Sequence, residues 1–263
     1  METANGITAR LVEQIAAAKS LVVFTGSGVS AESGIPTFRG AGGLWEGFRS
    51  EELATWPAFE RDPEKVWRWY DYRRQLIADV EPNPAHRAIA DLEPAFRTFR
   101  LITQNIDGLH QKAGSTAPIE LHGNIWRARC TKEHTVVELT ECPLRTFPPL
   151  CEKCGFPLRP DVVWFGEPLP PRAFESSYDA AACCDAMLVV GTSAQVMPAA
   201  SLPLVAKHNG AFVVEVNTGY TAVSALIDVT LMGQAGELLP KLAEGVLKIA
   251  ASRKPVRKGA RGL

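Results

Sequence analysis

A glycine-rich turn near the start of the chain has residue types that suit the binding of a phosphate. Residues 26–31, Gly-Ser-Gly-Val-Ser-Ala, fit the pattern G-x-G-x-x-G/A and directly follow the apolar run LVVF. Glycines permit a tight turn and let a pyrophosphate approach backbone N–H groups at a helix N-terminus. No strand that ends in an acidic residue follows ~20 residues later, although dehydrogenases have one there. The turn therefore indicates dinucleotide binding without the ordinary hydride-transfer arrangement.

A second polar loop and a nearby histidine offer amide, carboxylate and imidazole groups. The loop is Gln104-Asn105-Ile106-Asp107, and His122 follows it. Asn and Asp in such a loop also fit ordinary turn chemistry with local hydrogen bonds. A histidine that faces a dinucleotide crevice is a candidate general base, because its unperturbed pKa lies near neutral pH.

The cysteines of residues 130–154 have the clustering of a metal site or a redox site. Cys151 and Cys154 form a CxxC pair, Cys130 lies upstream, and Cys142 lies between them. In a reducing compartment disulfides are rare, so clustered cysteines more often indicate metal binding or catalysis.

Four short apolar runs predict the strands that position these groups. They cover residues 21–24, 99–103, 187–190 and 212–216, and each ends in a small or polar loop. Such runs, separated by helical patterns, predict buried parallel strands, and ligands bind beyond the carboxyl ends of these strands. We expect helices at residues 8–19, 84–92, 199–208 and 238–251. The predicted fold is α/β, with a Rossmann-like parallel sheet.

Two insertions interrupt this alternation of strands and helices and predict a smaller module. One, at about residues 40–80, is helical, and the other, at about 128–163, contains the CxxC pair. We expect one catalytic domain over residues 1–251 that includes both insertions. Residues 252–263 are basic, lack an apolar face and predict a flexible tail.

The predicted helix at residues 64–80 places an arginine on an apolar face. Helical spacing aligns Val66, Tyr70, Arg73, Ile77 and Val80. Arg73 and Tyr70 are neighbours at three-residue spacing and could bind a carboxylate together. Pairing of Arg73 with an internal acid, or extension of its aliphatic stem towards solvent, explains the pattern equally well. Arg74 falls off this face, and we expect it to be solvated.

Length and composition exclude several classes of protein. The chain has 263 residues, of which 46% are hydrophobic and 22% charged, and its formal net charge is −1. This charge excludes nucleic-acid binding through a general basic field. No apolar run approaches the ~20 residues of a membrane span, and the N-terminus lacks the apolar stretch of a signal peptide. We expect a cytoplasmic monomer with no nucleic-acid or membrane partner.

In combination the motifs resemble the sirtuin family of NAD-dependent protein deacylases. The resemblance rests on GSGVSAESGIPTFRG, TQNIDGLHQKAG, ELHGN, VVWFGE, GTSAQVMPAA and VEVN, in that order. It implies a reaction that consumes NAD: nicotinamide leaves, the acyl group is transferred, and free lysine and O-acyl-ADP-ribose are the products. The implied catalytic residues are His122, as general base on a ribose hydroxyl, with Asn105 and Asp107.

The resemblance also implies which residues bind NAD. The glycine turn would cradle the phosphates, the second loop would hold the nicotinamide ribose and carboxamide, and a further loop would cover the cofactor. The implied residues are Gly26, Ser27, Gly28, Ala31, Pro36, Thr37, Phe38, Arg39, Gln104, Asn105, Ile106, Asp107, Gly191, Thr192, Ser193 and Asn217.

An acylated-lysine protein or peptide is the implied second substrate. By resemblance, strand addition would involve Val163, Trp164, Phe165, Gly166 and Glu167. Tyr70 and Arg73 resemble the motif of desuccinylating sirtuins, and Ala54 matches the small residue that leaves room for a longer acyl chain. We therefore expect both deacetylation and desuccinylation.

The metal site departs from the family pattern of two CxxC-like pairs around one structural zinc. Cys130 is what is left of the first pair, because Glu133 stands three positions later, whereas Cys151 and Cys154 keep the second pair. Structural zinc normally has four ligands. We expect these three cysteines with Cys142 as the fourth ligand. His134 and Glu133 are the other candidates, and a metal-free module is the alternative.

Two other functions stay open at this point. Mono-ADP-ribosyl transfer from NAD shares the nicotinamide-release step, so the glycine turn and the second loop do not discriminate against it. A non-enzymatic NAD sensor or zinc-ribbon interaction module is disfavoured by His122, because a sensor needs no general base.

Overall fold

The larger sheet forms where the apolar runs predicted it. A computed structural model describes residues 6–37 and 50–253. In it six parallel strands lie in the order β3-β2-β1-β7-β8-β9. All of β7 and five of six β1 residues are buried, as expected for parallel strands that are covered on both faces. The strands are β1 (Ser20–Thr25), β2 (Thr98–Thr103), β3 (Ile119–Glu120), β7 (Ala186–Val190), β8 (Phe212–Asn217) and β9 (Val229–Met232).

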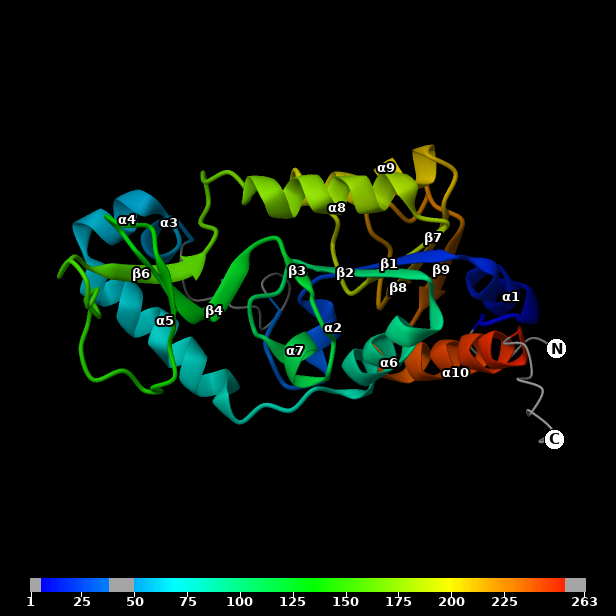
Figure 1. The fold of residues 1–263 in the computed structure, drawn as a ribbon, viewed down its shortest axis with the longest axis horizontal. Helices are drawn as coiled ribbons and strands as arrows, with labels where there is room; N and C mark the ends of the chain where they lie inside the picture. Colours follow the sequence, from blue (N-terminus) through cyan, green and yellow to red (C-terminus); the bar gives the residue numbers. More distant parts are fainter. Residues whose placement is uncertain (1–5, 38–49, 254–263) are drawn as a thin grey trace, which may run out of the picture.

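Helices cover both faces of this sheet (Figure 1). One face packs against α1 (Ala9–Ala17), α6 (Pro84–Leu92) and α10 (Ala235–Arg253), and the other against α8 (Pro171–Cys183) and α9 (Leu202–His208). The predicted helix starts hold, because Thr8 accepts a hydrogen bond from the Leu11 N–H and Asn83 accepts one from the Ala85 N–H. Helix α8 and strand β9 had no counterpart among the predicted elements.

The strand order changes direction between β1 and β7. The chain builds β1, β2 and β3 towards one edge, then crosses over to build β7, β8 and β9 towards the other. In doubly wound sheets this switch point is where a dinucleotide binds. The loops after β1 and β7 therefore meet at the place that the sequence motifs mark.

Both insertions contribute to one smaller module, which lies to the left in Figure 1. Three helices, α3 (Ser50–Leu53), α4 (Trp56–Arg61) and α5 (Pro63–Ala78), pack against an antiparallel sheet of β5 (Val136–Glu138), β4 (Gly123–Cys130) and β6 (Leu158–Val162). The Trp67 indole N–H donates to the Leu158 carbonyl at 2.7 Å and ties the helical part to the sheet. This confirms an α/β fold with a Rossmann-like sheet and a smaller module.

Helix α5 is buried on more of its circumference than its apolar face predicted. Tyr70 and Arg73 are buried as expected, but Arg74 is fully buried as well. The prediction that Arg74 is solvated was wrong. Its guanidinium contacts Asp71 at 2.9 Å and donates to the carbonyls of Leu139 and Glu141, because the cysteine-containing insertion covers this second face.

The last helix and four short helices are the remaining elements of the described residues. Helix α10 extends two residues past the predicted domain end at 251. Phe38, Arg39, residues 40–49 of the helical insertion and residues 254–263 of the tail lie outside the described residues. Among the helices of the described ranges, none is long and apolar enough to cross a membrane. The short helices are α2 (Gly28–Ala31), α7 (Leu109–Lys112), η1 (Glu93–Ala95) and η2 (Ala199–Ser201).

Candidate active site

The loops after β1 and β7 pack directly against each other at the switch point. The Gly26 N–H donates to the Val190 carbonyl at 3.0 Å, and the Gly28 N–H donates to the Gly191 carbonyl at 2.8 Å. A Cβ added at Gly28 would lie 2.8 Å from the Gly191 Cα, and one at Gly26 would lie 2.8 Å from the Thr192 Cβ. These glycines are therefore required by loop-to-loop contact, in addition to the room they leave for a phosphate.

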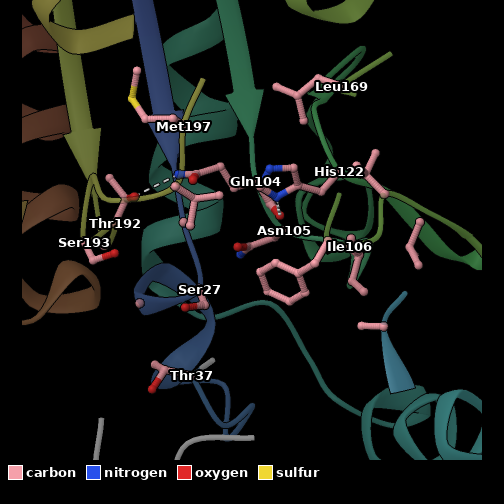
Figure 2. A pocket seen from close by; sticks show the side chains of 18 of the residues that line it. Ser27, Thr37, Gln104, Asn105, Ile106, His122, Leu169, Thr192, Ser193 and Met197 are labelled. Carbon is pink, nitrogen blue, oxygen red and sulfur yellow. Dashed lines mark hydrogen bonds between the residues drawn. The ribbon is translucent and has the colours of Figure 1, made fainter. Parts of the chain in front are cut away.

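Thr192 joins the loops that follow three strands. The Gln104 side-chain amide donates to the Thr192 hydroxyl at 2.8 Å, and the Asn217 amide donates to the Thr192 carbonyl at 2.9 Å. In Figure 2 Thr192 and Ser193 lie across from His122 and Asn105, with Gln104 between them. The loops after β2, β7 and β8 thus form one connected polar surface.

This surface forms one wall of a cleft of about 540 Å³. The smaller module forms the opposite wall, so the cleft joins predicted NAD residues and predicted substrate residues. Of the predicted residues, those that line it are Gly26, Ser27, Gly28, Thr37, Ala54, Tyr70, Arg73, Gln104, Asn105, Ile106, His122, Val163, Trp164, Phe165, Gly166, Glu167, Gly191, Thr192, Ser193 and Asn217. Among described residues expected at NAD, Ala31, Pro36 and Asp107 do not line this cleft.

Asp107 acts from behind the cleft wall. Its carboxylate accepts hydrogen bonds from the Ser30 hydroxyl at 2.8 Å and from the Leu109 N–H at 2.9 Å. The Asn105 amide donates to the same Ser30 hydroxyl at 3.0 Å. Burial raises the pKa of Asp107, while these hydrogen bonds act in the opposite direction. Asp107 therefore positions Ser30 and, through it, the Asn105 side chain that faces the cleft.

His122 has the environment of a neutral base. Its Nδ1 lies 3.0 Å from the carbonyl oxygen of Gln104. A carbonyl can only accept a hydrogen bond, so Nδ1 carries the proton and Nε2 keeps its lone pair. Burial lowers the pKa of His122, and the hydrogen bond to Gln104 opposes this shift. The imidazole ring is therefore neutral at neutral pH, with its one proton on Nδ1.

Two buried histidines beneath the cleft were missed by the sequence reasoning. His110 Nε2 lies 2.9 Å from the Thr25 hydroxyl, and His86 Nε2 lies 3.3 Å from the Ser30 hydroxyl. Their rings are 4.9 Å apart. Burial lowers the pKa of His86 to about 4 and that of His110 to about 3. His86 has no motif around it, and His110 lies within the TQNIDGLHQKAG segment, where only the polar loop residues before it had been selected.

The predicted acyl pocket lies at the end of the cleft nearest the smaller module. The Trp164 indole N–H donates to the Tyr70 hydroxyl oxygen at 3.0 Å. Burial raises the pKa of Tyr70 to about 12 and lowers the pKa of Arg73. The Arg73 guanidinium lies 4.9 Å from the centre of the Trp69 ring. A neutral phenol and a cationic guanidinium thus face one buried space, together with Ala54.

Residues 163–167 form a turn more than a strand. Gly166 has a φ of +86°, and the Phe165 N–H donates to the Ala54 carbonyl. Glu167 accepts from the Trp164 N–H at 2.8 Å and makes two contacts to the Arg159 guanidinium. The Glu167 carboxylate therefore stabilises this turn.

The cleft includes residues that had not been selected as site residues, some of them within the quoted motifs. Tyr220 is 81% exposed and follows β8, where only Asn217 had been selected. The signal was available, because every loop after a strand of this sheet points to the same edge. The added lining residues are Val162, Leu169, Val196, Met197, Pro198, Thr218, Gly219, Tyr220 and Thr221.

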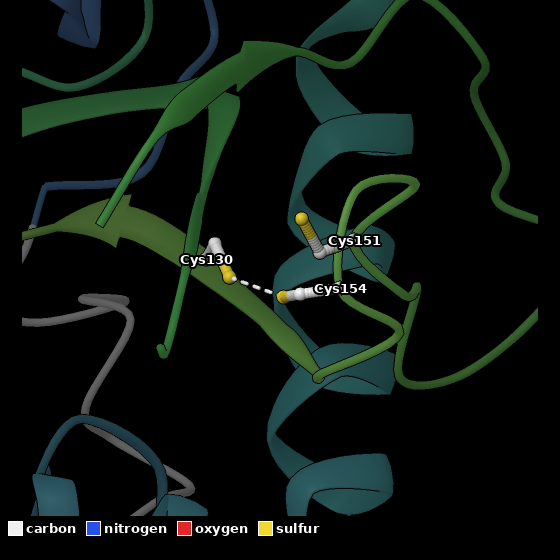
Figure 3. Close-up of side chains that lie close together, drawn as sticks. All are labelled: Cys130, Cys151 and Cys154. Carbon is white, nitrogen blue, oxygen red and sulfur yellow. Dashed lines mark hydrogen bonds between the residues drawn. The ribbon is translucent and has the colours of Figure 1, made fainter. Parts of the chain in front are cut away.

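Three of the predicted metal ligands converge in the smaller module. The Sγ atoms of Cys130, Cys151 and Cys154 lie within 4.8 Å of one another, and Cys130 and Cys154 are 3.5 Å apart (Figure 3). Three soft sulfur donors at one point fit zinc. The structure does not bring Cys142 to this group, which corrects its selection as fourth ligand. The charges acting on the Cys142 thiol are those of Arg74, Asp71 and Asp79, because its loop is attached to α5.

Taken together, the sheet order and the switch-point cleft are typical of a dinucleotide-binding α/β protein, with His122 as a candidate base and a separate thiol cluster. The model of the Sir2 family matches residues 26–198. The NAD-dependent protein deacylase 2 of Pyrobaculum aerophilum is 53% identical over 243 residues, which cover 92% of this chain and 97% of that protein. The chain belongs to the Sir2 family, which confirms the resemblance to sirtuins.

Solved structures agree with this assignment. A Sir2 homologue in complex with NAD has a TM-score of 0.88 and 46% identity, over 94% of this chain and 96% of that one. A second Sir2 protein, bound to a myristoylated histone peptide, has a TM-score of 0.74 and 38% identity, over 93% of this chain and 98% of that one.

Proposed function

We propose that the protein is an NAD-dependent protein-lysine deacylase that acts on acetyl-lysine and succinyl-lysine. The observation that carries this is the single cleft in which His122 lies between the polar loops of the sheet and the Tyr70–Arg73 pair. Two relatives share about half of their aligned residues with this chain, over most of its length. Both are named NAD-dependent protein deacylases, which supports the reaction class. A sensor without catalysis would have no use for a neutral, partly buried histidine in this position.

Each residue of the cleft has a proposed part in this reaction. NAD, as co-substrate, supplies an ADP-ribosyl group with nicotinamide as the leaving group. The turn at Gly26 and Gly28 and the loop at Thr192 would hold the phosphates, and Asn105 would orient the nicotinamide ribose. His122 Nε2 would accept a proton from a ribose hydroxyl, which becomes the nucleophile for the acyl carbon.

The Tyr70–Arg73 pair supports an acidic acyl group. The Tyr70 hydroxyl accepts a hydrogen bond from Trp164, which leaves its own proton for donation. A carboxylate placed between this hydroxyl and the buried Arg73 guanidinium would gain two charge-assisted hydrogen bonds. Acetyl-lysine needs neither bond, so the pair permits both acyl groups and favours succinyl.

Three further proposals concern the protein as a whole. We propose one structural zinc per chain at the Cys130–Cys151–Cys154 cluster, supported by the convergence of its three thiols. We propose a cytoplasmic monomer without nucleic-acid or membrane partners, supported by the net charge of −1. Mono-ADP-ribosyl transfer is not favoured, because the relatives at about half identity are named deacylases.

Mass spectrometry of two matched peptides tests the proposal. One peptide carries acetyl-lysine and the other succinyl-lysine, and each is incubated with the protein with and without NAD. We expect NAD-dependent loss of both groups, with O-succinyl-ADP-ribose formed from the second peptide. Loss of acetyl alone would refute the acidic-acyl proposal. Transfer of ADP-ribose to protein without deacylation would refute the reaction class.

A further inference from the structure

The two turns that carry the clustered thiols share one backbone design. In each, the N–H of the first residue donates to the carbonyl five residues later, from Cys130 to Thr135 at 2.9 Å and from Cys151 to Phe156 at 2.8 Å. In each, the N–H of the fifth residue donates back to the first carbonyl, from His134 at 3.0 Å and from Gly155 at 2.8 Å. The two turns are therefore equivalent, residue by residue.

Backbone dihedral angles confirm this equivalence independently. The fifth residue has a positive φ in both turns, +56° at His134 and +71° at Gly155. A positive φ is uncommon outside glycine, so its occurrence at His134 marks a turn built to a fixed geometry. With the fifth residues matched, the fourth residue of the first turn, Glu133, corresponds to Cys154 in the second.

Glu133 thus stands at the backbone position from which Cys154 directs its thiol to the cluster. The Glu133 N–H donates to the Cys130 Sγ at 3.3 Å, so this turn wraps around the first thiol. The Glu133 side chain is exposed, and its carboxylate is not among the three ligand atoms that converge in the structure, so metal binding would require it to turn towards the thiols. Carboxylate oxygens are among the ligands that zinc takes in tetrahedral sites.

The other two candidates are held elsewhere. The loop on both sides of Cys142 is bound to the buried Asp71–Arg74 pair, through the Glu141 carbonyl and the Leu144 N–H. His134 corresponds to Gly155, and a Cβ added at Gly155 meets nothing within 4 Å. A side chain at this position therefore begins in open space, without a neighbouring group that directs it to the thiols.

We propose that Glu133 is the fourth ligand, so that this chain binds its metal through three thiolates and one carboxylate. This ligand assignment rests on the proposed zinc site and does not depend on the reaction in the cleft. Replacing one soft thiolate by a harder oxygen weakens the binding of zinc relative to four thiolates. The metal of this protein should therefore exchange faster than that of its own Glu133→Cys variant.

Cobalt substitution and chelator competition test the assignment in the full chain. The thiolate-to-cobalt absorption reports the number of sulfur ligands, and competition with a chromophoric chelator reports zinc affinity. The variants are Glu133→Gln, Glu133→Cys and Cys142→Ser. Glu152→Gln is the matched control, because Glu152 is an exposed carboxylate in the equivalent second turn. Thermal unfolding of each variant shows whether the module is intact.

We expect one metal ion per wild-type chain, with Glu133→Gln weakening zinc binding at least about tenfold. Glu133→Cys should tighten binding and raise the absorption by about one third, from three sulfurs to four. Cys142→Ser and Glu152→Gln should change neither quantity. The proposal is overturned by loss of about one quarter of the absorption in Cys142→Ser, the change from four sulfur ligands to three. It is equally overturned by unchanged affinity in Glu133→Gln, or by a wild-type chain that binds no metal.

Discussion

His122 Nδ1 donates a hydrogen bond to the carbonyl oxygen of Gln104, at 3.0 Å. Gln104 also donates from its side chain to Thr192, in the loop after β7. The same residue therefore sets the tautomer of the proposed base and joins two of the loops proposed to hold NAD. Any movement of the loop that contains Gln104 would therefore alter the orientation of the proposed base and the proposed binding of NAD together.

Removal of the proposed base should abolish most turnover without unfolding the protein. We expect His122→Ala to lower kcat for deacylation by about 10²- to 10⁴-fold, the usual contribution of a general base. His208→Ala, at an exposed position on α9, is the control and should keep wild-type rates. Steady-state kinetics, with thermal unfolding of both variants, checks this. Near-normal turnover in His122→Ala would exclude the proposed role.

The pH profile should report the lowered pKa of His122. A base acts in its unprotonated form, so activity is present above its pKa and is lost as the pH falls through it. Because burial holds this pKa below 6.5, the acid limb of kcat/KM should have its midpoint below pH 6.5. An acetyl-lysine peptide is the proper substrate, because its acyl group does not titrate. A midpoint at or above 6.5 would contradict the assignment.

Arg73 should discriminate between acidic and neutral acyl groups. We expect Arg73→Met to lower kcat/KM for succinyl-lysine by about 10²- to 10³-fold, because one partner of a buried charge pair is lost. Deacetylation should change less than about tenfold. Arg68→Met, which removes an exposed arginine on the same helix, is the matched control. An equal loss of both activities would identify Arg73 as a structural residue.

The buried Asp71–Arg74 pair should contribute strongly to stability. Both side chains are almost fully buried, and Arg74→Met removes the cation that pairs with Asp71 and the donor to two backbone carbonyls. We expect a loss of about 3–5 kcal/mol in the free energy of unfolding, measured by denaturant titration. Arg68→Met should stay within about 0.5 kcal/mol of wild type. A loss below about 1 kcal/mol for Arg74→Met would show that the pair is dispensable.

His86 and His110 should make the protein less stable in acid. Their folded-state pKa values, about 4 and about 3, lie below the unfolded value of 6.5. As the pH falls below 6.5 the unfolded chain binds protons that the folded chain does not, so stability is lost down to the folded pKa values. Each histidine should contribute a slope of about 1.4 kcal/mol per pH unit.

Denaturant titrations at pH 7, 6 and 5 measure this slope. His86→Gln should reduce the slope of unfolding free energy against pH by about 1.4 kcal/mol per pH unit, the contribution of one histidine. The exposed control His208→Gln should leave the slope unchanged. A wild-type stability that does not fall between pH 6 and pH 5 would contradict the assignment of these two groups as buried and neutral.

The residues that sequence reasoning placed correctly are those whose signal is local. The apolar runs of β1, β2, β7 and β8 predicted buried strands, and parallel strands must release their loops at one edge. His122, Asn105 and the Gly26–Gly28 turn therefore met in one cleft, as expected. Tyr70 and Arg73 were placed together because three-residue spacing on a helix makes neighbours.

The residues that were misplaced depend on contacts between distant segments. Arg74 was expected in solvent, because one helix face does not reveal that a segment 65 residues later covers the opposite face. Cys142 was selected for the softness of its sulfur, but the loop around it is bound to Asp71 and Arg74.

The sequence by itself thus determined the fold class, the family and the edge of the sheet at which the candidate base lies. These follow from periodicity and from residue types at fixed short spacing, which act within one strand or one helix. Only the tertiary structure decided which histidines are buried, which groups donate hydrogen bonds to Asp107, and which of the cysteines converge. Those answers depend on backbone dihedral angles and on packing between the two insertions, which no local pattern encodes.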